Sequence, residues 1–167
     1  MKYCITVAVC VFVFTTVAAE PVKTVSDNER CPVCGMFVAK YPNWLAQIQL
    51  ADGETAMFDG VKDMMAYFFE PRKYGAKSTV EDVYVKDYYS QQWVDGKKAL
   101  YVLGSDVMGP MGHELIPLAS MKAAKSFLED HKGKKIYNFN EIDRALIDAL
   151  RSGGMGGSMQ TMKHSNN

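Results

Sequence analysis

Residues 44–71 read WLAQIQLADGETAMFDGVKDMMAYFFEP, a stretch that carries two signals of regular structure. Two short runs rich in apolar residues, 44–50 and 55–58, flank an Asp-Gly pair, which is a strong signal for a β-hairpin. After Asp59, a plausible helix cap, apolar residues recur at helical spacing until Pro71 ends the run. The stretch therefore predicts a hairpin followed by a helix.

A second stretch of the chain repeats this order. The runs 88–94 and 98–103 flank another Asp-Gly pair, which again predicts a hairpin. Residues 118–128 then have the apolar spacing of a helix, with Ser120 near its start. The two helical segments also match in their pattern of apolar residues. We interpret this as a weak internal repeat, and chance similarity between two amphipathic helices is the alternative.

The repeat predicts an α+β fold made of two related ββα-type units with antiparallel sheets, at roughly residues 31–78 and 79–152. Further strands are expected at 79–86 and 135–139. A last helix is expected at 142–150, because its apolar residues lie on one helical face and glycines follow.

The first nineteen residues have the pattern of a secretory signal. Lys2 supplies the positive charge, an apolar run of roughly a dozen residues follows, and Val17 and Ala19 fit the small-residue cleavage pattern. The run is too short for a good membrane-spanning helix, and a retained N-terminal anchor is the alternative. We expect residues 1–19 to be removed and the mature chain, with a polar and flexible lead-in at 20–30, to be periplasmic.

The composition excludes several classes of protein. The 19 basic residues balance the 19 acidic residues, so no basic surface for nucleic acid is expected. No apolar stretch after the signal is long enough to span a membrane. Without the signal, Cys31 and Cys34 are the remaining cysteines, which is far from a disulfide framework. The Gly- and Met-rich tail at 153–167 has no apolar run, so it is expected to be disordered and to hold metal weakly at most.

The segment CPVCGM at residues 31–36 leaves several kinds of site open. A structural zinc site usually needs four protein ligands, and the chain offers no second cysteine pair and only widely spaced histidines. A dithiol–disulfide oxidoreductase would use Cys31 and Cys34, although Gly35 and Pro42 disfavour the helix that usually follows such a pair. An inert structural disulfide is the plainest alternative.

The methionines favour a soft-metal site instead. Met36 follows the cysteine pair, and Met108, Met111 and His113 lie in 104–113, which is rich enough in Gly and Pro to predict an irregular loop. Methionines in such a loop have no obvious core to fill. Thiolate and thioether sulfur select Cu(I), and imidazole also binds copper. The candidate copper ligands are Cys31, Cys34, Met36, Met108, Met111 and His113. Ordinary packing is the alternative for the methionines, and a surface position is the alternative for the histidine.

These elements together resemble one known family. CPVCGM at 31–36, the hairpin and helix that follow it, and GPMG at 109–112 are similar to the NosL family, the copper-binding accessory proteins of nitrous oxide reductase. The resemblance covers about residues 28–150. It implies a periplasmic Cu(I)-binding protein, not an enzyme, that supplies copper to the reductase or its maturation complex. It also implies an α+β fold of two related ββα-type units.

The resemblance carries over to particular residues. The family's cysteine-glycine-methionine element corresponds to residues 34–36, and its late methionine corresponds to Met111. Members can also use an acidic residue just before the cysteine element, for which Asp27 and Glu29 are the candidates. Many members are lipoproteins, whereas this sequence has no cysteine suited to lipid attachment. The copper hypothesis needs Met111 and also Met36, whereas the oxidoreductase hypothesis needs only the cysteines.

Overall fold

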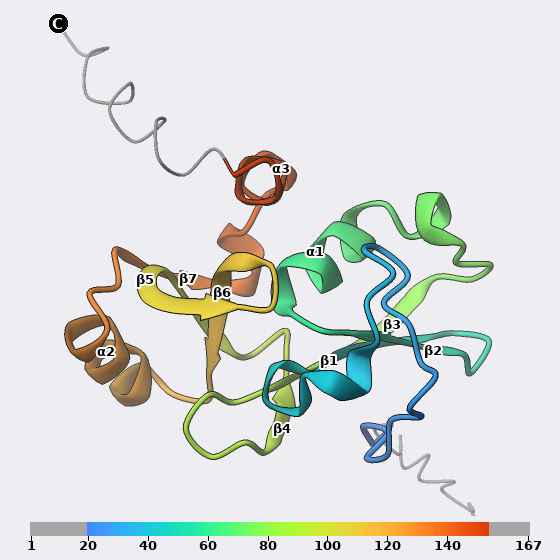
Figure 1. Cartoon of the computed structure of the whole chain (residues 1–167), viewed down its shortest axis with the longest axis horizontal. Coiled ribbons are helices and arrows are strands. Elements are labelled where there is room, and N and C mark those ends of the chain that lie inside the picture. The colour runs from blue at the N-terminus through green and yellow to red at the C-terminus, as the bar shows by residue number, and fades with distance from the viewer. Residues whose placement is uncertain (1–19, 154–167) are drawn as a thin grey trace, which may run out of the picture.

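The structure is a computed structural model that describes residues 20–153 (Figure 1). The predicted signal, residues 1–19, lies outside the described residues, and so does the predicted tail from residue 154 onward. Within the described part, the chain forms a four-stranded sheet and a three-stranded sheet. Figure 1 shows the two sheets side by side, with α1 and α3 above them.

The first sheet has the strand order β2-β1-β3-β4, with all neighbours antiparallel. Its strands are β1 (Ala46–Leu50), β2 (Thr55–Phe58), β3 (Val80–Lys86) and β4 (Trp93–Asp95). The Asp-Gly turn joins β1 to β2 as predicted. Gly53 has a φ of 85° there, which glycine adopts without a steric penalty. The strand predicted at 79–86 is β3, and it pairs with β1.

The second sheet has the strand order β6-β5-β7, also antiparallel. Its strands are β5 (Leu100–Gly109), β6 (Gly112–Leu118) and β7 (Lys135–Asn138). The predicted irregular loop at 104–113 is wrong. Met108 pairs with His113 and Gly109 with Gly112, so this stretch forms the end of the β5–β6 hairpin. Pairing with a partner strand outweighs the low strand propensity of glycine and proline.

The second Asp-Gly turn connects the two sheets and does not close a hairpin. The N–H groups of Lys98 and Ala99 donate to the carbonyl of Asp95 at 3.1 and 3.0 Å, so the chain turns as expected. However, β4 pairs with β3 and β5 pairs with β6 and β7, so the predicted hairpin around this turn is wrong. The strands on either side of the turn, β4 and β5, pair with other strands and not with each other. The division of the chain into repeats at 31–78 and 79–152 stays a prediction.

Three α-helices in the described residues cover these sheets: α1 (Val61–Phe69), α2 (Met121–Asp130) and α3 (Arg144–Arg151). Short 3-10 helices lie at η1 (Val38–Lys40), η2 (Pro42–Trp44), η3 (Pro71–Tyr74) and η4 (Phe139–Glu141). As predicted, Ser120 caps α2, accepting a hydrogen bond from the N–H of Ala123. The predicted cap at Asp59 is wrong, because the N-cap of α1 is Gly60. The Asp59 side chain is therefore available for another contact.

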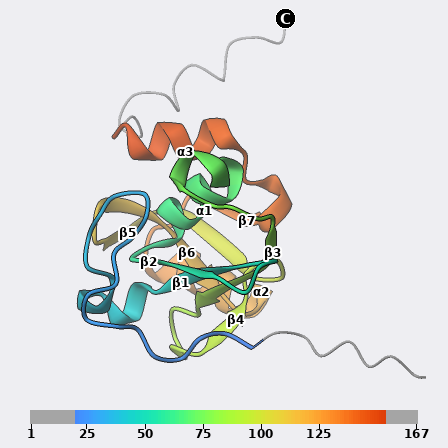
Figure 2. The same cartoon turned by 90° about the vertical axis from the view of Figure 1, so that its right-hand side faces the viewer.

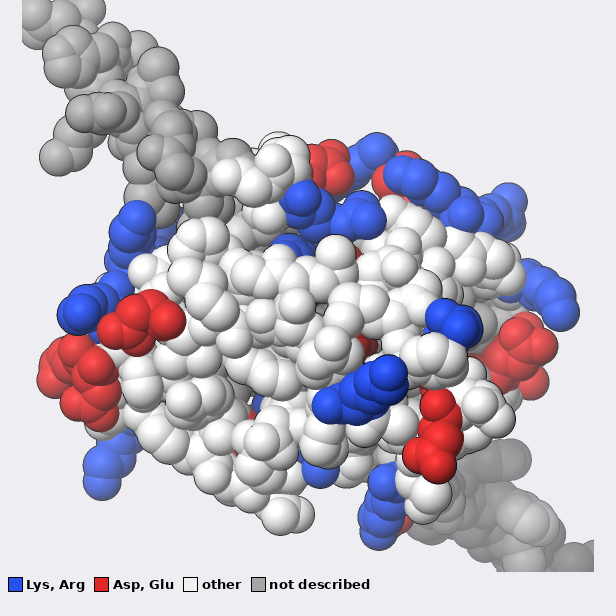
Figure 3. Space-filling view, viewed as in Figure 1, with Lys and Arg blue, Asp and Glu red and all other residues white. Residues whose placement is uncertain are grey.

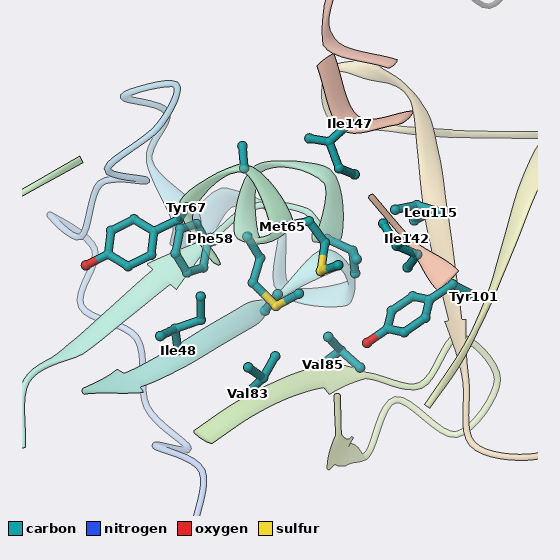
Figure 4. Packing of buried hydrophobic residues seen from close by; sticks show 14 of the residues in the cluster. Ile48, Phe58, Met65, Tyr67, Val83, Val85, Tyr101, Leu115, Ile142 and Ile147 are labelled. Atoms are coloured by element: carbon teal, nitrogen blue, oxygen red, sulfur yellow. The ribbon is translucent and has the colours of Figure 1, made fainter. Parts of the chain in front are cut away.

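The core lies where the two sheets meet beneath α1. In Figure 4, Met65 of α1 points between Val85 of the first sheet and Tyr101 and Leu115 of the second, and all four are fully buried. Figures 1 and 2 show α3 beside α1, where Ile147 joins the same core. A smaller apolar cluster lies between α2 and the second sheet. No helix of residues 20–153 has the length and apolar character needed to cross a membrane.

Candidate metal centre

The cysteine pair lies in a tight loop that backbone hydrogen bonds hold closed. The N–H of Cys31 donates to the carbonyl of Met36, and the N–H of Gly35 donates to the carbonyl of Cys31, both at 2.9 Å. Gly35 has a φ of 79°, a left-handed conformation in which a residue with a Cβ would be strained. Arg30 Nη1 also donates to the carbonyl of Gly35 at 2.8 Å. The loop thus curls back on itself and brings the sulfur of Cys34 within 4.8 Å of that of Cys31.

Two carboxylates contact these thiols. Cys34 Sγ lies 3.2 Å from Asp59 Oδ1, and Cys31 Sγ lies 3.7 Å from Asp63 Oδ2. One ligand atom from each of the four residues lies within 4.8 Å of the other three. Cys34 is half-buried and the other three are buried, and both cysteines are free thiols. We call Cys31, Cys34, Asp59 and Asp63 the thiol–carboxylate group, which is compact enough to hold one metal ion.

The two carboxylates come from the start of α1. Asp59 follows β2, and Asp63 lies in the first helical turn, where a negative charge is favourable because the N-terminal end of the helix dipole is positive. Asp27 and Glu29, the acidic candidates from the sequence, are not members of the group, and a metal-binding role for either stays a prediction. The sequence does contain a signal for these two ligand candidates, since Asp59 and Asp63 lie four positions apart at the predicted start of a helix. From the sequence, Asp59 is interpreted as a helix cap.

Burial raises the pKa of both thiols. The pKa of Cys31 rises to about 12, mainly through burial and also through the nearby charge of Asp63, while the N–H groups of Cys34 and Val33 oppose the rise. Burial is also the main cause of the raised pKa of Cys34, with Asp63 and Cys31 adding to it and the N–H of Met36 opposing it. Reactive cysteines of redox enzymes have lowered pKa values. The thiols of this group are instead protonated near neutral pH unless a cation replaces the protons.

The other candidate ligands lie on the β5–β6 hairpin, beside the start of α1. The side chains of Met108 and Met111 are 50% and 49% exposed, and His113 is exposed as well. Lys62 Nζ donates to the backbone carbonyls of Met111 and His113 at 3.0 and 2.9 Å. Because Lys62 directly precedes Asp63, these bonds hold the hairpin turn near the thiol–carboxylate group. His113 is not itself a member of that group.

Glu114 also fastens the β5–β6 hairpin to the start of α1. Its Oε1 accepts hydrogen bonds from the backbone N–H groups of Lys62 and Leu115 at 2.7 and 2.9 Å. Burial raises the pKa of Glu114 to about 7, against the opposing effects of the Leu115 N–H, the charge of Lys62 and the Lys62 N–H. A Cβ on Gly60 would collide with the Glu114 carboxylate, so the close approach of the hairpin to α1 requires glycine at that position.

The structure therefore joins only part of the predicted ligand set directly. Cys31 and Cys34 are together, and Met36 is half-buried in the same loop. Met108, Met111 and His113 approach from the second sheet, on a hairpin fastened to α1. Which of these six residues bind metal stays a prediction.

The fold and the thiol–carboxylate group define a small α+β protein with a candidate metal centre at the junction of two antiparallel sheets. The NosL family profile matches residues 21–147, which is most of the chain, so this protein belongs to the NosL family. The copper-binding lipoprotein NosL of Stutzerimonas stutzeri is 30% identical over 149 residues, a span of 81% of this chain and 74% of that protein.

A solved structure supports the fold independently. The crystal structure of the copper chaperone NosL from Shewanella denitrificans matches with a TM-score of 0.67 at 23% sequence identity. The match covers 77% of this chain and 99% of that chain. This likeness confirms the predicted α+β fold with antiparallel sheets.

Proposed function

We propose that this protein is a periplasmic Cu(I)-binding accessory protein that supplies copper for the maturation of nitrous oxide reductase. The observation that carries the proposal is the thiol–carboxylate group in a chain of the NosL family, with two free thiols inside a set of four donors within 4.8 Å. Copper is the cargo in this role. The protein binds and releases the ion and performs no catalytic turnover.

The donor set supports Cu(I) as the cargo. Cu(I) is a soft ion that thiolate and thioether sulfur select over harder donors. Cys31 and Cys34 supply two sulfur atoms on one short loop, and Met36 lies on the same loop. The raised pKa of both thiols means that an ion has to displace protons to bind, so the site favours ions with a strong preference for sulfur.

The hairpin methionines supply a route for transfer. Met108 and Met111 are half exposed, whereas Cys31 is buried, so an acceptor reaches the thioethers more easily than the thiols. Thioethers do not close into disulfides, so they stay usable when the oxidising periplasm oxidises the cysteine pair. We assign Met111 as a ligand, with Met36, Met108 and His113 as further candidates.

The acceptor in this proposal is the reductase itself or its maturation complex. The signal pattern in residues 1–19 supports a periplasmic location for the mature chain, where the acceptor would meet it. In Figure 3, blue and red side chains are interspersed, mostly towards the edge of the visible face, and no continuous blue surface covers that face. Such a surface fits contact with a protein better than contact with nucleic acid.

The alternative function is a dithiol–disulfide oxidoreductase that uses Cys31 and Cys34. The raised pKa of both thiols opposes it, because that chemistry needs a thiolate as nucleophile. The loop also leads into short 3-10 helices, not into the α-helix that usually presents such a pair.

One experiment separates these functions. The reduced mature chain is titrated with Cu(I) and with Zn(II), each in competition with a chelator of known affinity, and compared with Cys34→Ser. We expect tight one-to-one Cu(I) binding, weaker Zn(II) binding, and a large loss of Cu(I) affinity in Cys34→Ser. The exposed Met121→Leu is the matched control and should bind like wild type. Tight zinc binding with weak Cu(I) binding, or rapid reduction of an insulin disulfide, would overturn the proposal.

A further inference from the structure

A positive charge from the last helix stands beside the thiol–carboxylate group. Arg151, at the end of α3, places its Nε atom 3.4 Å from Asp63 Oδ1. Its Nη1 atom donates to the hydroxyl of Tyr74 at 3.0 Å, so the guanidinium is held from two sides. The side chain of Asp63 is only 4% exposed, and that of Arg151 is 31% exposed.

The Asp63 carboxylate is only partly satisfied by these contacts. Its Oδ2 atom faces Cys31 Sγ at 3.7 Å. Its Oδ1 atom is buried and has no hydrogen-bond donor among the described residues, since the Arg151 contact is an ion pair without hydrogen-bond geometry. A buried carboxylate oxygen without a donor is costly, so this atom favours a cation placed against it.

We propose that Arg151 determines the ion specificity of the thiol–carboxylate group by favouring a monovalent over a divalent cation. The proposal rests on the function proposed above, with Cu(I) as the cargo. An ion bound between the thiols and Asp63 shares that carboxylate with a fixed guanidinium. The repulsion from Arg151 is proportional to the charge of the ion, so it opposes Zn(II) twice as strongly as Cu(I).

The size of the effect follows from Coulomb's law. At about 4 Å and with the dielectric constant of water, one fixed charge changes the affinity for a monovalent ion about fivefold and that for a divalent ion about twenty-fivefold. A less polar surrounding makes both factors larger, and the divalent factor remains the square of the monovalent one. The ratio of the two affinities therefore changes about fivefold, and any effect of the substitution that is common to both ions cancels in it.

The protein offers close controls for this charge. Arg144 lies on the same helix and pairs with Glu70 at 3.1 Å and with Asp148 at 3.5 Å. Neither of these ion pairs involves the thiol–carboxylate group. Removing the charge of Arg144 changes the net charge of the protein by the same amount as removing that of Arg151, and both substitutions fall on α3.

The test compares wild type with Arg151→Gln, Arg151→Lys and Arg144→Gln. Each reduced protein is titrated with Cu(I) alone and with Zn(II) alone, in competition with chelators of known affinity. In Arg151→Gln we expect Cu(I) to bind about fivefold tighter and Zn(II) about twenty-fivefold tighter. Arg151→Lys keeps the charge, so both it and Arg144→Gln should keep the wild-type ratio. An unchanged ratio in Arg151→Gln overturns the proposal.

A second variant, Tyr74→Phe, keeps the proposal testable if Arg151→Gln does not fold. Tyr74→Phe keeps the ring that stacks on Tyr67, with centroids 6.2 Å apart, and removes only the oxygen that holds Arg151. If Arg151→Gln does not fold by its thermal transition, Tyr74→Phe decides, and it should shift the ratio towards Zn(II). An unchanged ratio there also overturns the proposal. Wild-type protein that fails to bind Cu(I) would refute the proposed function, whereas tight Cu(I) binding with an unchanged ratio would refute only the role of Arg151.

Discussion

Lys62 Nζ donates a hydrogen bond of 3.0 Å to the backbone carbonyl of Met111, 49 positions further along the chain. The bond joins α1, which carries Asp63, to the turn of the β5–β6 hairpin, which carries the candidate methionine ligand. Lys62 is only 4% exposed. The position of Met111 relative to the thiol–carboxylate group therefore depends partly on this buried cation, together with the hydrogen bonds of Glu114.

Lys62→Leu should lower the free energy of unfolding by about 1–3 kcal/mol. The variant removes the donor to the carbonyls of Met111 and His113, and it removes the positive charge near the buried Glu114. Urea denaturation measures the change. Lys98→Leu is the control, because the side chain of Lys98 is 85% exposed and pairs with Asp95 at the surface, so it should cost less than about 1 kcal/mol. Equal losses in the two variants would contradict the role given to Lys62.

Met111→Leu should weaken Cu(I) binding at least about tenfold, which corresponds to about 1.4 kcal/mol. Leucine is close to methionine in size but has no sulfur, and the side chain of Met111 is 49% exposed, so the fold should be unaffected. Competitive Cu(I) titration measures the affinity, and circular dichroism monitors the fold. The control is Met121→Leu on α2, a methionine that is 46% exposed.

The same titration on oxidised and reduced wild-type protein shows which sulfur atoms dominate. If Met111 and its neighbours contribute as proposed, the protein with a Cys31–Cys34 disulfide should retain measurable Cu(I) binding. Complete loss on oxidation, together with unchanged binding by Met111→Leu, would make the cysteines the whole site and the hairpin methionines ordinary surface residues.

The thiols should react slowly with alkylating agents at pH 8. With a pKa of about 12, Cys31 is ionised in about one molecule in ten thousand at that pH, whereas a free cysteine with a pKa of about 8.5 is ionised in about a quarter. Iodoacetamide should therefore modify Cys31 at least about a hundredfold more slowly than it modifies a cysteine peptide. The rate should still be rising with pH above 10. Rapid modification at pH 7 would instead favour the oxidoreductase hypothesis.

Tyr101→Phe should destabilise the fold by about 1–2 kcal/mol. The fully buried Tyr101 hydroxyl donates to the carbonyl of Gly96 at 2.6 Å, which fastens the turn between the two sheets. Phenylalanine fills the same space and leaves that carbonyl without its donor. Tyr89→Phe is the control, since Tyr89 is 48% exposed and should give a change near zero. Thermal unfolding of both variants measures the difference, and equal midpoints would contradict this account.

Local structure in this protein was readable from the chain alone. The β1–β2 hairpin, α1 and the Ser120 cap of α2 depend on turn residues and on apolar spacing within a few neighbouring positions. The backbone of the loop at residues 31–36 is equally local, because the backbone hydrogen bonds within it join residues at most five positions apart. Such features follow from steric preference and periodicity, which short sequences encode.

Long-range pairing decided the remainder. Met108 and Gly109 belong to a strand because β6 supplies their partners, His113 and Gly112. The second Asp-Gly turn joins two sheets because each flanking strand pairs elsewhere. Asp59 and Asp63 reach the thiols from 25 and 32 positions away, and Arg151 reaches Asp63 only because α3 packs on α1. The local pattern of a strand is compatible with many partner strands. Which partner pairs with it depends on which side chains are buried in the core, and this is settled only when the whole chain is folded.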